Sequence, residues 1–124
     1  MAGSYTLVPI YSSKGEVGAF LCYPYILDRG GEWIGWVNPD RQVFSVRGNH
    51  IGWLTHEPRI LRKISGEYTS RQTSPEVPPH ITVPATVPLA PLLAELTYGT
   101  IDVLDDAPEL LPAQDFGELR EDMD

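Results

Sequence analysis

The fold of this chain depends on the stretch Ile10-Tyr11-Ser12-Ser13-Lys14-Gly15-Glu16-Val17-Gly18 and on two further copies of its pattern, Ile26-Leu27-Asp28-Arg29-Gly30-Gly31-Glu32-Trp33-Ile34-Gly35 and Val43-Phe44-Ser45-Val46-Arg47-Gly48-Asn49-His50-Ile51-Gly52. The copies begin 16 and 17 positions apart, and each has an apolar pair, then Ser or Asp, then glycine three positions further on. Ser or Asp is typical of the start of a type I turn, and the glycine supplies the positive φ that closes the turn with a bulge. Each copy therefore predicts a β-hairpin.

A second glycine follows in the outgoing strand of each copy, at Gly18, Gly35 and Gly52. Because glycine inside a strand weakens it, its recurrence predicts that another backbone or an aromatic ring approaches closely there. A degenerate fourth copy begins at Ile60-Leu61, 17 residues after the third. One hairpin cannot bury its apolar face alone, whereas several around a common axis can. The sequence therefore predicts an all-β head, a pseudo-four-fold repeat of short β-hairpins with a flower-like or barrel-like shape.

These glycine-closed copies, with Val17-Gly18, Ile34-Gly35-Trp36 and Ile51-Gly52-Trp53 on their return strands, resemble the four-fold β-flower family. The resemblance covers about residues 7–68 and implies four short hairpins set around a pseudo-four-fold axis. It implies no catalytic residues. A tryptophan-glycine repeat or a small SH3-like barrel is an alternative that the same pattern allows.

The second half of the chain has a different composition. Residues 71–91 are rich in proline, with five prolines between positions 75 and 88, and they predict an extended linker with polyproline II stretches. We therefore divide the chain into a β-hairpin repeat domain over residues 1–70, this linker, and an acidic tail over residues 92–124.

The segment Pro91–Gly99 predicts a short helix at the start of the tail, because proline begins it, leucines share one face and glycine ends it. Residues 76–124 carry eleven acidic side chains and one arginine, whereas residues 1–75 carry eight basic and six acidic ones. Acidic and apolar residues alternate in the tail, as in segments that fold on a partner. We therefore expect the tail to dock on a protein partner or on another copy of the chain. The apolar residues expected to make this contact are Leu92, Leu93, Leu96, Leu104, Leu110, Leu111 and Phe116.

Nothing in the sequence indicates catalysis, a metal site or a cofactor. The single cysteine, Cys22, lies in an apolar run, which favours a buried and unreactive thiol. The three histidines lack zinc-ligand spacing, and no glycine-rich nucleotide motif opens a helix. We therefore expect no enzyme activity and no cofactor. Because no signal peptide or membrane-spanning run is visible, we expect a soluble, cytoplasmic protein without membrane contact.

The head offers two candidate contact surfaces. Arg59, Arg62 and Lys63 form a basic cluster suited to phosphate groups, and Trp33 would anchor a partner if its ring is exposed. The main hypothesis is a non-enzymatic protein–protein interaction or assembly module, in which deletion of residues 87–124 abolishes association and leaves the head folded. One alternative is a nucleic-acid-binding head with an autoinhibitory acidic tail, although nucleic acid is the less expected partner. The other is a small-ligand binder at the hairpin axis.

Overall fold

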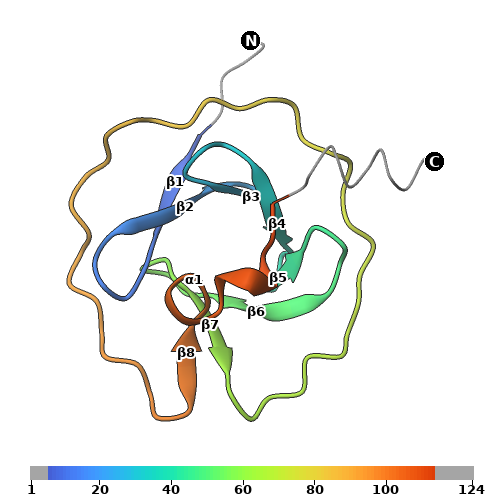
Figure 1. Cartoon of the computed structure of the whole chain (residues 1–124), viewed down its shortest axis with the longest axis vertical. Helices are drawn as coiled ribbons and strands as arrows, with labels where there is room; N and C mark the ends of the chain where they lie inside the picture. The colour runs from blue at the N-terminus through green and yellow to red at the C-terminus, as the bar shows by residue number, and fades with distance from the viewer. Residues whose placement is uncertain (1–5, 114–124) are drawn as a thin grey trace.

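The computed structural model describes residues 6–113, and in this part of the chain eight strands form one antiparallel sheet that curls into a half-barrel (Figure 1). The strands follow one another in chain order from β1 to β8, and every neighbouring pair is antiparallel. This arrangement confirms the prediction of an all-β head built from hairpins. The strands are β1 Val8–Tyr11, β2 Val17–Cys22, β3 Tyr25–Asp28, β4 Trp33–Val37, β5 Gln42–Ser45, β6 His50–Leu54, β7 Ile60–Lys63 and β8 Thr100–Asp102.

The first three hairpins close as the repeated pattern predicts. In each turn the glycine N–H donates to the carbonyl of the Ser or Asp three positions earlier, at 2.9–3.0 Å. The three glycines have φ between +87° and +91°, a conformation that other residues adopt only at a cost. The strand register shifts by one residue just before each turn, which is the bulge expected from this turn type. These turn glycines are Gly15, Gly31 and Gly48.

The core lies on the axis of the repeat. The first residues of the four copies, Ile10, Ile26, Val43 and Ile60, are fully buried and belong to one apolar cluster. Their common position confirms that Ile60 begins a fourth copy. These side chains pack together on the axis, where one alternative hypothesis placed a small ligand.

The second glycines of the repeat allow close packing, as predicted. A Cβ atom at Gly35 would lie 2.5 Å from the carbonyl oxygen of Phe44, and one at Gly52 would fall on the carbonyl oxygen of Leu61. The side chain of Leu104 takes this place at Gly18, where a Cβ atom would meet it at 2.9 Å. Glycine is therefore required at Gly35 and Gly52, where the backbone of the neighbouring strand lies too close for a side chain.

The fourth hairpin differs from its prediction, because its return strand comes from far along the chain. β7 pairs with β8, and residues 64–99 form the connection between them. Gly99, with φ +83°, precedes β8 as the turn glycines precede the earlier return strands. The residues directly after β7 form no strand that could pair with it. Strand β8, Thr100–Asp102, pairs with β7 instead and leads directly into the buried Val103.

Residues 64–99, which we call the belt, run around the outside of the strands (Figure 1). Residues 72–97 contain no helix or strand, in agreement with the extended conformation predicted for residues 71–91. Ile81 is only 4% exposed and belongs to an apolar cluster with residues of the head. The belt is therefore packed against the domain and does not act as a free spacer.

The helix predicted over Pro91–Gly99 is not formed. Two turns are too few to be stable without packing, and this part of the belt stays extended. A four-residue helix, α1 Val103–Asp106, follows β8 instead, and a 3₁₀ turn, η1 Pro108–Leu110, follows α1. Helix α1 begins where it does because the Asp102 carboxylate caps it, accepting from the N–H of Leu104 at 3.0 Å.

The described part of the predicted tail packs on the head. Helix α1 lies near the centre of the ring of strands in Figure 1, and Val103 and Leu111 belong to the axial core. Deletion of residues 87–124 would therefore remove a strand and two core side chains. The head is not expected to stay folded after that truncation, contrary to the expectation from sequence. No helix within residues 6–113 has the length and apolar character needed to cross a membrane.

Candidate interaction site on the outer face

A second apolar cluster covers the face of the sheet that points away from the axis. Leu27 and Phe44 directly follow the axial residues Ile26 and Val43, so strand alternation turns them to this outer face. The ring of Trp36 stacks on that of Phe44 with centroids 4.6 Å apart. The buried members of this outer aromatic face are Cys22, Leu27, Trp33, Trp36 and Phe44, and Ile81 of the belt packs with them.

Two rings of the outer aromatic face also supply polar groups. Tyr25 and Trp33 meet edge to face with centroids 5.8 Å apart, and the indole N–H of Trp33 donates to the carbonyl of Gly35 at 2.8 Å. Burial raises the pKa of the Cys22 thiol, which agrees with the predicted unreactive thiol. The face therefore combines flat apolar rings with hydroxyl and N–H donors at its rim.

The Tyr25 hydroxyl and a second indole N–H, that of Trp36, bind the belt. The Tyr25 hydroxyl donates to the carbonyl of Glu76 at 2.7 Å, and the Trp36 indole N–H donates to Ser74 Oγ at 3.0 Å. Ser74 Oγ in turn donates to the carbonyl of Val46 at 2.6 Å. The Tyr11 hydroxyl lies 3.4 Å from the carbonyl of Pro88, on the opposite part of the belt. A proline-rich segment is bound well in this way, because it lacks N–H donors but keeps its carbonyl acceptors.

The turn glycines bring the belt close to the hairpins. The N–H of Gln72 donates to the carbonyl of Gly48 at 3.0 Å, and a Cβ atom at Gly48 would fall on the Gln72 carbonyl. At Gly31 a Cβ atom would lie 2.9 Å from the carbonyl oxygen of Ile81. The same two glycines thus serve the turn, through their positive φ, and the belt, through their missing side chain.

The belt has a three-residue period that the sequence analysis did not identify. Pro75, Pro78 and Ile81 are half-buried or buried, whereas the residues between them are exposed. The half-buried positions 87, 90, 93 and 96 continue the same spacing. A polyproline II helix has three residues per turn, which accounts for this spacing. The spacing is interrupted once, where Val83 is half-buried and Pro84 is exposed. In the sequence, this period is visible as apolar residues at every third position. The same spacing of Leu93 and Leu96 is also compatible with a helix, which explains the incorrect helix prediction.

The outward side of the belt is apolar and uncharged. Leu89 is 95% exposed and Leu92 is 100% exposed, and Val77 and Tyr98 are also exposed. No Asp, Glu, Lys or Arg occurs between residues 77 and 94. We call the exposed side chains of residues 77–94 the outer strip. Exposed apolar side chains of this size, grouped on one segment, are typical of contact surfaces.

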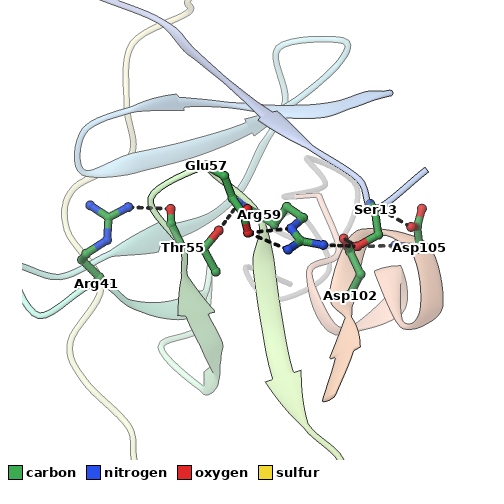
Figure 2. A network of polar contacts seen from close by, with 7 residues as sticks. All are labelled: Ser13, Arg41, Thr55, Glu57, Arg59, Asp102 and Asp105. Carbon is green, nitrogen blue, oxygen red and sulfur yellow. Dashed lines mark hydrogen bonds and ion pairs between the residues drawn. The ribbon is translucent and has the colours of Figure 1, made fainter. Parts of the chain in front are cut away.

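A polar network joins the first hairpin to the end of the sheet (Figure 2). The Arg59 guanidinium is bound by Glu57 at 2.6 Å and donates to Ser13 Oγ at 2.9 Å. Ser13 Oγ donates to Asp102 at 2.7 Å, and the Ser13 N–H donates to Asp105 at 3.1 Å. These contacts connect the turn after β1 with the loop before β7, with β8 and with α1, so they hold the two ends of the curled sheet together.

The carboxyl group of Asp102 is fully buried inside this network. Burial raises its pKa above the ordinary value of 3.8, and the neighbouring charge of Asp105 acts in the same direction. The hydrogen bond from Ser13 opposes this shift but does not cancel it. All these groups have partners within the head, and within residues 6–113 no buried side-chain polar atom lacks one. The network is therefore suited to holding the structure together.

A pocket of about 350 Å³ opens between the hairpins and the C-terminal segment. The carboxylates of Glu16, Asp28 and Asp105 line it beside the apolar Leu104 and Leu111. Among the described residues, no group of three or more His, Cys, Asp or Glu side chains is placed to hold a metal ion. The Asp28 carboxylate already accepts from two turn N–H groups at 2.8 and 2.9 Å. The pocket thus contains groups that serve the turns and the helix.

The four head residues predicted to form a contact surface differ in their exposure to solvent. Arg59 is only 2% exposed and Trp33 is buried, so neither offers the contact surface expected from sequence. Arg62 is half-buried, donates to the carbonyl of Ile51 at 2.7 Å and lies 4.1 Å from the ring centroid of Tyr68. Lys63 is exposed. Arg59 is buried between Glu57 and Ser13, and Ser13 lies 46 residues away in the chain, so no local pattern shows this contact.

The tail residues expected to bind a partner fall into three groups. Leu111 is buried in the axial core, and Leu104 and Leu110 are partly buried against it. These three side chains have contacts within their own chain, and their role in partner binding stays a prediction. Leu93 and Leu96 are half-buried in the belt, and Leu92 is fully exposed on its outward side. Phe116 lies outside the described residues.

The fold and the outer face together define a small all-β protein of repeated hairpins with a bound extended segment. A family model described as "4-fold beta flower protein" matches residues 8–95. The chain belongs to the four-fold β-flower family, which confirms the resemblance seen in its repeats. The match extends past the hairpins through most of the belt, so the belt is part of what the family model describes. The comparison with curated proteins and the comparison with solved structures found no match.

Proposed function

We propose that this protein is a non-enzymatic protein-interaction module and that the outer strip is its contact surface. The observation that carries the proposal is the full exposure of Leu89 and Leu92 on a segment without charged side chains. Burying one such leucine at an interface stabilises association by about 1.5–3 kcal/mol before the costs of ordering are counted. The rigid hairpin domain would present this strip to an apolar surface of a second copy or of another protein.

The charge distribution favours this function over nucleic-acid binding. Arg59 is bound inside the polar network, and the Arg41 guanidinium donates to the carbonyl of Thr55 at 2.6 Å (Figure 2). Arg41 also donates to the carbonyl of Leu54 at 2.9 Å. The outer strip carries no cation, whereas phosphate binding depends on Lys and Arg. The proposed contact is therefore apolar and should depend little on salt.

Sedimentation and affinity capture test the proposal with the full chain. The double variant Leu89→Ser/Leu92→Ser should lose concentration-dependent self-association, or lose the proteins that immobilised wild type retains. The matched control is Ile64→Ser, because Ile64 is also an exposed apolar residue but lies outside the outer strip. Retention of every partner and of self-association by the double variant would exclude the strip as the contact surface.

A further inference from the structure

The outer aromatic face has the features of a recognition groove for an extended proline-rich segment. Its floor consists of aromatic rings, and its rim offers the Tyr25 hydroxyl and the Trp36 N–H. Grooves that recognise polyproline II segments combine flat aromatic rings with donors aimed at backbone carbonyls. In this chain residues 72–83 of its own belt occupy the groove.

We propose that this groove is a binding site for extended segments of the type found in the belt, and that the belt of a second copy can occupy it. The groove lies beneath the belt, whereas the contact surface proposed above lies on the belt's outward side. The two sites can therefore be tested separately.

The contacts define what the groove recognises. Glu76 contributes its carbonyl and Gln72 its N–H, backbone groups that do not depend on the identity of the side chain. Selectivity comes from the apolar side chains at every third position, of which Ile81 is the most deeply buried, and from the small Ser74 that bridges Trp36 and the carbonyl of Val46. A suitable ligand therefore has apolar residues three positions apart and a serine before the first of them.

The tether determines how such a ligand competes. A segment joined to the domain at both ends acts at an effective concentration in the millimolar range, so a free copy must displace a strong local competitor. Weakening the tethered belt lowers this competition without changing the groove. Ile81→Asp does this, because it places a charge in the apolar cluster beside the aromatic rings.

The experiment measures the binding of a fluorescent peptide with the sequence of residues 70–86 to full-length variants by anisotropy. We expect the Ile81→Asp variant to bind the peptide at least about tenfold more tightly than wild type does, as the lost tethered competitor requires. Val83→Ser is a milder variant of a half-buried belt residue, and it should give a smaller gain in the same direction. It keeps the test decisive if near-ultraviolet circular dichroism shows that Ile81→Asp does not fold.

Three controls decide the outcome. A peptide that carries Ile81→Asp itself, or a scrambled peptide of the same composition, should not bind. Adding Tyr25→Phe to the Ile81→Asp variant removes the hydroxyl that donates to the carbonyl of Glu76, and it should weaken binding of the original peptide several-fold. Leu89→Ser/Leu92→Ser should leave peptide binding unchanged. The proposal is overturned if folded belt variants bind the peptide no better than wild type, or if the scrambled peptide binds as tightly as the original.

Discussion

At the scale of single residues, a few positions have two structural duties each. Gly31 and Gly48 close turns with positive φ and also let the belt backbone pass where a Cβ atom would lie. Asp102 caps helix α1 and at the same time receives the Ser13 hydroxyl inside the polar network. A substitution at one of these residues removes both of its interactions, so it should destabilise both of the elements that the residue joins.

Asp102 should make the stability of the protein depend on pH in a characteristic direction. Its folded pKa is raised above 3.8, so between the unfolded and folded pKa values the folded state holds more protons. The free energy of unfolding should therefore increase as the pH falls through the folded pKa, and this gain should stop near the unfolded value.

Urea unfolding of wild type and Asp102→Asn across a series of pH values isolates this contribution. Asn keeps an oxygen for the α1 cap but does not titrate. The stability of wild type relative to the variant should rise on acidification from neutral pH. A relative stability that falls over the same interval would show that the folded pKa is lowered.

At the scale of elements, the C-terminal segment behaves as a part of the head. Strand β8 completes the fourth hairpin, and α1 and η1 place their apolar residues on the axial core. Leu104 packs at Gly18, and Leu111 packs at Gly35. The segment thus closes one end of the curled sheet, where a separate tail was expected.

Two leucine substitutions of identical chemistry test this placement. Leu111→Ala should lower the free energy of unfolding by about 3 kcal/mol, because it removes a buried side chain from the core. Leu92→Ala should change it by no more than about 0.5 kcal/mol, because Leu92 is fully exposed. Chemical denaturation of both variants gives the comparison, and equal losses would contradict the packing of residues 100–111 on the head.

At the scale of the whole molecule, the belt is an unusually long hairpin connection wrapped around its own domain. Closing a loop of this length costs roughly 2 kcal/mol more than closing one about eight times shorter. Burial of Ile81 returns about 1.5–3 kcal/mol, so packing against the outer aromatic face offsets the cost. These two contributions nearly cancel, which would suit the binding role proposed for the belt.

Replacing residues 64–99 with the turn Ser-Val-Arg-Gly-Asn of the third hairpin tests this balance. The variant should fold cooperatively with a stability within a few kcal/mol of wild type, because the gain in loop closure offsets the lost burial. It should also expose the outer aromatic face and bind the dye 8-anilinonaphthalene-1-sulfonate more strongly than wild type does. A variant that does not fold would show that the belt is essential to the domain, and unchanged dye binding would show that the belt does not cover the face.

The hairpins and their axial core could be predicted from the sequence because their determinants are local. Turn type depends on residues only three positions apart, and the recurrence of that spacing places Ile10, Ile26, Val43 and Ile60 on one axis. The three-residue period of the belt is equally local, and it would have indicated the inward-facing belt residues except at Val83 and Pro84.

The partner of β7, the burial of Arg59 and the destination of the C-terminal leucines could not be found in this way. Each depends on contacts between residues far apart in the chain, such as Ser13 with Asp102 or Tyr25 with Glu76. The candidate groove belongs to this second class, because its rings come from separate strands and its ligand from the belt. Local patterns specify which elements form, whereas the burial of apolar surface across the curled sheet selects which of them meet.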